Sequence, residues 1–171
     1  LIASEQRRRQ LTGNIKLGAG GIREIEFFAQ SFQLIHGGRE PDLQVKGLHE
    51  TLSAIAALAL AGKDDIETLY RHYLFLRKTE HTLQQINDEQ TQLLPADEFR
   101  RTVLAEVTGF PSYDDFLQEL EKVCHGVHTR FRELIDSSED NHDADDSVFL
   151  RCRDAWDLEL TEDEFCALTT P

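Results

Sequence analysis

Residues 113–134 read YDDFLQELEKVCHGVHTRFREL, and their large apolar side chains recur every three or four positions. This spacing places the apolar side chains on one face of an α-helix and the charged side chains on the other. The apolar stripe consists of Phe116, Leu120, Val123, Val127, Phe131 and Leu134. Because such a helix is stable mainly when other elements cover its apolar face, the stretch predicts a helical bundle.

The remainder of residues 1–135 shows the same helical period, without a sustained alternation of period two. Four further helices are expected at about 21–36, 48–61, 66–87 and 97–109, with at most a token strand near 15–17. The predicted fold class is therefore all-α, a bundle of about five amphipathic helices.

Local signals predict where these helices end and which faces they bury. We expect Gly37-Gly38 to form a left-handed cap on the first helix, and Asp64 or Asp65 to cap the third. The helix at 97–109 is expected to bury a stripe formed by Phe99, Val103 and Val107.

Charge divides the chain into a body and an acidic tail. The net charge is −14, and residues 136–171 hold 12 Asp and Glu against two Arg. Residues 136–147 are therefore predicted to be an acidic linker, and residues 148–171 the start of a further helical segment. Nucleic acid is not an expected partner, because the only basic run, Arg7-Arg8-Arg9, is short.

The remaining composition indicates the setting of the protein. The longest apolar run, 54–61, is too short to cross a bilayer, so no membrane segment is expected. Three cysteines without a C-x-x-C spacing are typical of a reducing compartment, which predicts a cytoplasmic location. The chain contains no Met, from which we expect it to be a piece of a longer protein.

A glycine-rich stretch, NIKLGAGGIREIEFF at 14–28, leads into the first helix. It is not a dinucleotide fingerprint, because Arg23 occupies the position of the third glycine, and it lacks the Gly-Lys of a P-loop. Free amides at a helix start can face an anion, so a nucleotide- or phosphate-proximal site is one hypothesis and a structural turn is the other. The residues of the hypothetical site are Lys16, Gly18, Gly20, Gly21, Arg23 and Glu26.

Two other constellations favour structural interpretations. Glu80 lies within an apolar stripe of the third helix, where a carboxylate needs a partner. Arg77 at i−3, or an Arg on another helix, is the expected partner, and a structural ion pair of Arg77 and Glu80 is predicted. His125 and His128 follow Glu121 at helical spacing, but no third ligand motif supports a metal, and none is predicted. The acidic run 143–146 lacks the glycine and terminal Glu of a calcium loop.

The glycine stretch and the element FLRKTEHTLQQINDEQTQLLP at 75–95 closely resemble the glutamine synthetase adenylyltransferase family. That family places a K-x-G-x-G-G-[IL]-[RT]-[DE]-I-E-F signature at the start of a helical domain that follows a nucleotidyltransferase module. The resemblance implies that residues 1–135 are the helical domain after the first, adenylyl-removing module. It also implies glutamine synthetase, a PII signal protein and the upstream module as partners, with Mg²⁺ and ATP or phosphate as cofactors of the parent enzyme.

The catalytic G-S-x-x-[DE]-x-D element of the family is missing, since no Gly-Ser dipeptide occurs in the chain. We therefore expect no catalytic residue, no bound cofactor and no activity in this piece alone. Within the D-E-Q-T…L-P element (88–95), Gln92-Leu93 stand where the family often has His-Thr. Two alternatives stay open: the helical domain of a PII uridylyltransferase, against which Glu26-Phe27 count, and a stand-alone helical interaction module.

Overall fold

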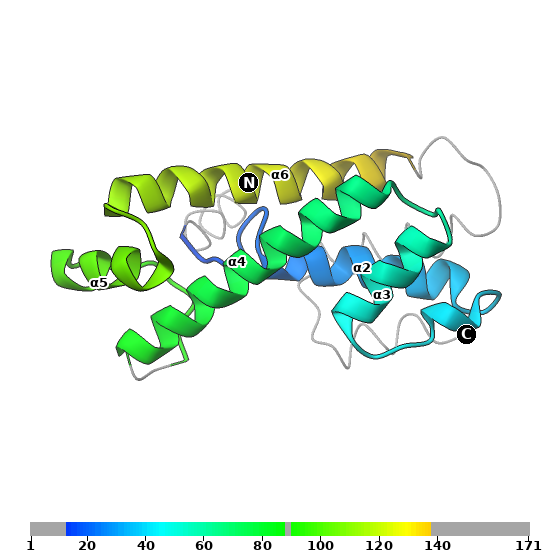
Figure 1. Ribbon diagram of the computed structural model, residues 1–171, viewed down its shortest axis with the longest axis horizontal. Helices are drawn as coiled ribbons and strands as arrows, with labels where there is room; N and C mark the ends of the chain where they lie inside the picture. Colours follow the sequence, from blue (N-terminus) through cyan, green and yellow to red (C-terminus); the bar gives the residue numbers. More distant parts are fainter. Residues whose placement is uncertain (1–12, 88–89, 138–171) are drawn as a thin grey trace, which may run out of the picture.

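The two longest helices of the described residues have 25 residues each (Figure 1). Helix α6 (Tyr113–Ser137) runs along the long axis of the molecule, and α4 (Lys63–Asn87) crosses obliquely to it. The computed structural model describes residues 13–87 and 90–137. Three shorter helices complete the bundle, namely α2 (Ile22–His36), α3 (Leu48–Ala57) and α5 (Glu98–Thr108), with a 3-10 turn η1 (Pro41–Leu43). Helix α2 contacts α3, α4 and α6, whereas α5 contacts α4 and α6.

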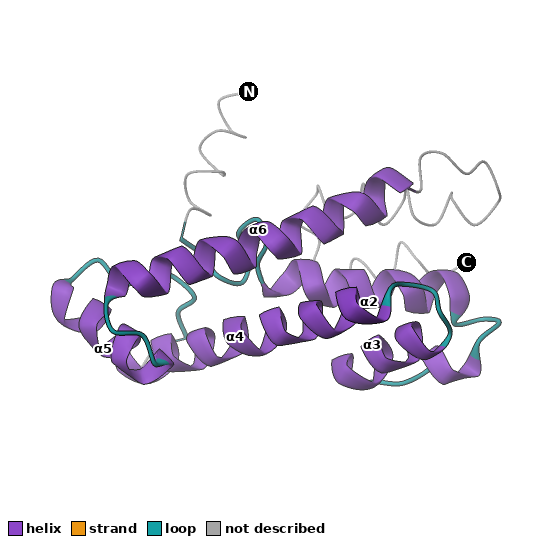
Figure 2. Ribbon diagram, turned by 45° about the horizontal axis from the view of Figure 1, so that its top comes forward, coloured by secondary structure: helices purple, strands orange, loops and turns teal. Residues whose placement is uncertain are grey.

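The all-α prediction is confirmed. Helices α5 and α3 lie toward opposite ends of the bundle, and the described residues contain no strand (Figure 2). The expected token strand is reduced to a single antiparallel bridge between Asn14 and Leu93. The predicted linker 136–147, apart from the end of α6, and the predicted segment 148–171 lie outside the described residues.

The predicted stripe of α6 forms part of the core. Phe116, Leu120, Val123, Val127 and Phe131 are all less than a tenth exposed. The first four pack in one cluster with Ile22 and Ile25 of α2 and with Leu76 and Leu83 of α4, all of which are buried completely or nearly so. Phe131 packs edge-on against Phe27 of α2. The burial of such apolar stripes against one another provides most of the stability of a helical bundle.

The predicted stripe of α5 is wrong. Phe99 is 77% exposed and Val107 is 51% exposed, whereas Leu104 and Ala105 are buried. Each residue advances 100° around a helix, so Leu104 and Ala105 lie on a different face from the predicted stripe. Thr108 completes the buried face by donating its hydroxyl to the Leu104 carbonyl at 2.6 Å. The sequence offers two apolar faces on α5, and packing against α4 and α6 selects the one with the smaller residues.

Several predicted helix ends also need correction. Helix α3 ends at Ala57 rather than near 61, because Ala59 adopts φ +54° and turns the chain. Gly37 is right-handed, with φ −61°, so the left-handed cap expected there is absent. The left-handed cap is found instead at Gly109, with φ +96°, at the end of α5. Helix α4 begins three residues earlier than expected, which places the two aspartates in its first turn.

Candidate functional site

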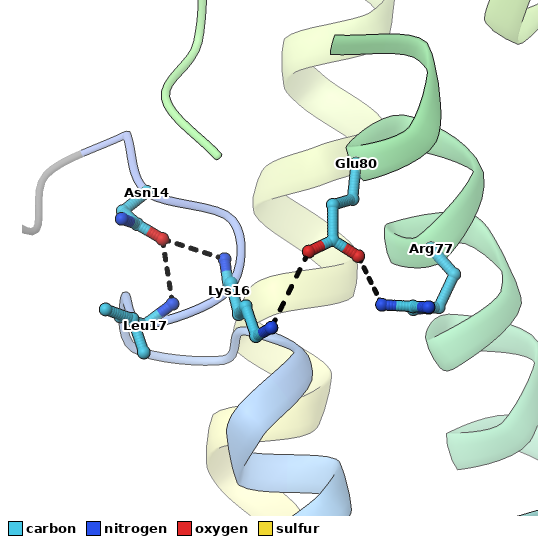
Figure 3. Close-up of polar contacts among 5 residues, drawn as sticks. All are labelled: Asn14, Lys16, Leu17, Arg77 and Glu80. Atoms are coloured by element: carbon cyan, nitrogen blue, oxygen red, sulfur yellow. Dashed lines mark hydrogen bonds and ion pairs between the residues drawn. The ribbon is translucent and has the colours of Figure 1, made fainter. Parts of the chain in front are cut away.

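The glycine turn, residues 14–21, is held rigidly by its own polar groups. The Asn14 side chain accepts hydrogen bonds from the amides of Lys16 and Leu17 at 3.0 and 2.8 Å (Figure 3). The Asn14 carbonyl accepts a third from the Gly18 amide at 2.9 Å. An asparagine that bonds to amides two and three residues onward is a common way to fix a tight turn. The turn therefore holds the backbone of Lys16 in one position.

The amides at the start of α2 are already donated within the protein. The Ile22 amide donates to the Ile15 carbonyl and the Arg23 amide to the Lys16 carbonyl, both at 3.2 Å. The Glu24 amide donates to Gly21 at 3.2 Å. The expectation that these amides are free to face an anion is therefore wrong. Any anion near this turn would be bound by side chains.

Close packing against α6 explains the glycine at position 20. Gly20 has φ +73°, and a Cβ added there would lie 1.9 Å from the backbone oxygen of Cys124. Gly21 has the same kind of restriction, since its Cβ would lie 2.5 Å from the Lys16 carbonyl oxygen. Both positions exclude a side chain, so these glycines serve to seat the turn against α6 and against itself.

A buried carboxylate that the sequence analysis did not single out, Glu24, ties α2 to α6. Glu24 is 5% exposed and lies 3.1 and 3.2 Å from Nδ1 of His128 through its two oxygens. Burial raises the pKa of Glu24, while the bonds from His128 and from the Gly20 amide oppose that rise. The sequence held one signal for this burial, because Glu24 lies at helical spacing from Phe27 and Ser31. In the structure all three side chains are buried.

The histidines considered as metal ligands have other surroundings. His128 contacts Glu24, as described, and His125 is exposed. Within residues 13–87 and 90–137, no group of three or more His, Cys, Asp or Glu side chains is arranged to hold a metal ion. The pKa of the Cys124 thiol is raised to about 11, first by burial and then by Glu24 and Glu121, so this thiol is a poor nucleophile.

The second polar cluster surrounds Glu80 on α4, and we call it the Glu80 cluster (Lys16, Arg77 and Glu80). Glu80 is 2% exposed, and the Arg77 guanidinium donates to its Oε2. Lys16 approaches from the glycine turn, with Nζ 3.9 Å from Oε1 of Glu80 (Figure 3). The structure thus contains the Arg77–Glu80 pair and adds a second cation from a segment sixty residues away in the chain.

The six candidate residues therefore fall into two groups. Gly20 and Gly21 brace the turn, and Gly18 closes it by its amide bond to Asn14. Lys16 belongs to the Glu80 cluster, and the Arg23 backbone is bonded directly to it. The Glu26 carboxylate, on α2, acts electrostatically on Tyr73 of α4, as Arg77 and Glu80 do. Lys16 and Glu26 both lie near α4, Lys16 beside Glu80 and Glu26 near Tyr73.

Residues 1–135 match a family model described as GlnD PII-uridylyltransferase. The chain belongs to this family. A relative in the family is the bifunctional glutamine synthetase adenylyltransferase/adenylyl-removing enzyme of Alteromonas mediterranea, which is 56% identical over 165 residues. The alignment covers 96% of this chain and 17% of the relative. The resemblance to glutamine synthetase adenylyltransferases is therefore confirmed.

The two comparisons also bear on the alternatives. The family model carries the name of the uridylyltransferase, so it does not separate the two enzymes by itself. Identity of 56% to an adenylyltransferase favours that enzyme over the alternatives. In addition, none of the helices in the described residues has the length and apolar character that crossing a bilayer requires.

Proposed function

We propose that this chain is the helical domain that follows the adenylyl-removing nucleotidyltransferase module of a bifunctional glutamine synthetase adenylyltransferase. In this proposal, residues 1–135 form the helical domain, 136–147 the acidic linker and 148–171 the start of the next helical segment. The parent enzyme reversibly adenylylates a tyrosine of glutamine synthetase, which regulates nitrogen assimilation. The observation that carries the proposal is the 56% identity over nearly the whole chain to an enzyme whose name states both activities.

The role of this domain is to line one side of the deadenylylation site. In phosphorolysis an oxygen of inorganic phosphate bonds to the phosphorus of the adenylyl group, and the bond to the tyrosine oxygen breaks. The products are ADP and the free tyrosine, whose oxygen takes up a proton. The phosphate groups that react are anionic, and Lys16 and Arg23 are joined through their backbones at the glycine turn. These two cations are suited to offset that negative charge.

The metal chemistry belongs to the upstream module. Phosphoryl transfer in this family uses Mg²⁺ held by carboxylates, and ATP serves the opposite reaction. We assign the carboxylates that hold this metal to the upstream module, because the chain lacks the G-S-x-x-[DE]-x-D element of the family. For the same reason we expect this piece alone to be inactive.

The partners and location follow from the same proposal. Glutamine synthetase is the substrate, a PII signal protein is the regulator, and the upstream module packs against the domain within one chain. The cysteine usage supports work in the cytoplasm. The family model named for PII uridylyltransferase supports the second candidate, a helical domain of that enzyme.

An arginine substitution in the full-length enzyme tests the proposal. Arg23→Ala should reduce the rate of deadenylylation about a hundredfold, as the loss of a charge-stabilising donor does. Arg71→Ala is the matched control, because Arg71 is exposed on α4 and bonds to Thr68 of its own helix at 2.9 Å. Both variants should keep the melting temperature of the parent within a few degrees. Normal deadenylylation by Arg23→Ala would contradict this role.

A further inference from the structure

Glu80 is contacted by two cations from opposite sides. Arg77 donates to one carboxylate oxygen, and the Lys16 ammonium lies 3.9 Å from the other. Figure 3 shows the two side chains converging on Glu80 from different elements, Arg77 from α4 and Lys16 from the glycine turn. One cation is enough to neutralise a buried carboxylate, so the second gives the cluster a surplus positive charge.

Both cations keep an exposed side. The Lys16 side chain is 36% exposed and the Arg77 side chain 34%, against 2% for Glu80. The separation of 3.9 Å between Lys16 and Glu80 exceeds a hydrogen bond, so this contact uses none of the three ammonium donors. Arg77 has five donors, and the bond to Glu80 occupies one side of its guanidinium. The cluster can therefore donate to a further anion from outside.

A hydroxyl donor, Tyr73, and a further carboxylate, Glu26, lie near the Glu80 cluster. The Tyr73 hydroxyl has its pKa raised above the ordinary value, chiefly by burial, so it stays protonated and can donate a hydrogen bond. The Glu26 carboxylate of α2 acts on the same hydroxyl, and the Arg23 backbone is bonded to Lys16. The Glu80 cluster itself, with two cations and one carboxylate, carries one excess positive charge.

The position of Lys16 is fixed by bonds that do not involve its ammonium. Its amide donates to Asn14, and its carbonyl accepts from the Arg23 amide at 3.2 Å. The turn itself is seated on α6 through Gly20. Because the backbone is fixed, Glu80 needs only to orient the side chain. Glu80 orders the two flexible cationic side chains before a ligand binds. The loss of side-chain entropy on ligand binding is therefore smaller.

We propose that Glu80 is a positioning residue that presents Lys16 and Arg77 together to a phosphate group. The ligand class is a phosphate oxyanion, either inorganic phosphate or the phosphate of the adenylyl group. The inference rests on the proposed function, in which both of these anions enter the site. It extends that function by adding Arg77 to the phosphate-contacting groups and by giving Glu80 a role beyond structural pairing.

Steady-state kinetics of deadenylylation by the full-length enzyme test the inference. Lys16→Ala and Arg77→Ala should each raise the KM of one anionic substrate about tenfold or more, with kcat changed much less. A rise in the KM of inorganic phosphate identifies phosphate as the ligand, whereas a rise in the KM of adenylylated glutamine synthetase identifies the adenylyl phosphate. The double variant should be little worse than either single variant, since the two cations act as a unit.

Glu80→Gln separates positioning from direct binding. This variant keeps both cations and the shape of the buried side chain but removes the charge that orients them, and it should raise the same KM. Arg130→Ala is the control: Arg130 on α6 is 42% exposed and pairs with Glu133 at i+3 and with Asp65 in the first turn of α4. Neither partner belongs to the Glu80 cluster, so both KM values should stay unchanged. Unchanged KM values in Lys16→Ala and Arg77→Ala, with only a lower melting temperature, would overturn the inference.

A binding measurement distinguishes this inference from the proposed function. Inorganic phosphate should raise the melting temperature of the full-length enzyme above that in chloride of equal ionic strength, and Arg77→Ala should abolish the rise. An enzyme without phosphorolysis that still shows this rise would refute the proposed function and support the phosphate site. Active enzyme whose rise survives in both Arg77→Ala and Lys16→Ala, and whose KM for adenylylated glutamine synthetase is also unchanged in both, would refute the phosphate site and leave the proposed function standing.

Discussion

Gly20→Ala should destabilise the chain more than Gly→Ala at any other position of the glycine turn. Two separate costs act there. At φ +73° an alanine is strained by roughly 1–2 kcal/mol. Its Cβ would also lie 1.9 Å from the Cys124 oxygen, so the turn must retreat by roughly 1.6 Å to reach an ordinary contact of about 3.5 Å. Overpacking of this kind costs about 1–3 kcal/mol, and the total loss is therefore about 2–5 kcal/mol.

Two neighbouring glycines separate these costs. Gly13 has φ +84° but open space around its Cβ position, so Gly13→Ala should lose only the strain of about 1–2 kcal/mol. Gly21 has extended backbone, with φ −79°, but its Cβ would meet the Lys16 carbonyl oxygen at 2.5 Å. Gly21→Ala should therefore lose about 1–3 kcal/mol from crowding alone.

Urea unfolding followed by far-ultraviolet circular dichroism measures all three variants of the 171-residue chain. Midpoints should fall in the order parent, Gly13→Ala, Gly21→Ala and Gly20→Ala, with a common dependence on denaturant. A loss for Gly20→Ala within about half a kcal/mol of that for Gly13→Ala would refute the reasoning. It would mean that the turn is not seated on α6.

Three further predictions concern charge, packing and capping. Because burial raises the pKa of Glu24 above its ordinary 4.5, its contribution to stability is full below that pH and is lost as the pH rises through the raised pKa. Urea unfolding at several pH values should thus show the parent losing stability relative to Glu24→Gln as pH increases, and a constant difference would contradict this. Leu104→Ala should lower the free energy of unfolding by about 2–5 kcal/mol. Phe99→Ala alters a side chain that is 77% exposed and should change the free energy of unfolding by less than about 0.5 kcal/mol. Equal losses in the two variants would support the stripe that the sequence predicted for α5. Asp97→Ala should cost about 1 kcal/mol, since the Asp97 carboxylate caps α5 through the Arg100 amide at 2.9 Å, and an unchanged melting temperature would show that this cap adds no stability.

The fold was predictable where a single apolar stripe decides the face of a helix. The stripe of α6 is unambiguous, and Phe116 and Val127 are buried as expected. Helix α5 offers two apolar faces, so its orientation depends on the shape of α4 and α6, which periodicity does not encode. Glu80 was predictable for the same reason as the stripe of α6. It lies within an apolar stripe of α4, and that position predicted a buried ion pair.

The candidate site was predictable only in part, for a related reason. The candidate residues came from one continuous motif, and contacts within that motif, such as Arg23 to Lys16, lie close in sequence. The bond between Glu24 and His128 joins residues 104 positions apart and arises only from the packing of α2 on α6. Likewise, the occupied amides at the start of α2 depend on a turn that folds back, which residue types alone did not indicate.

The bridge between Asn14 and Leu93 bears on how the two segments can vary in evolution. Its hydrogen bonds run between backbone atoms, from Ile15 to the Gln92 carbonyl at 3.0 Å and from Leu94 to the Gly13 carbonyl at 3.1 Å. Side chains at 92 and 93 can thus change without breaking these bonds, and Leu93 is 50% exposed. An inserted or deleted residue would instead shift the pairing by one position and rotate the turn that carries Lys16. Substitutions should therefore accumulate in these two segments while their lengths stay constant, and a length change in one should be accompanied by a change in the other.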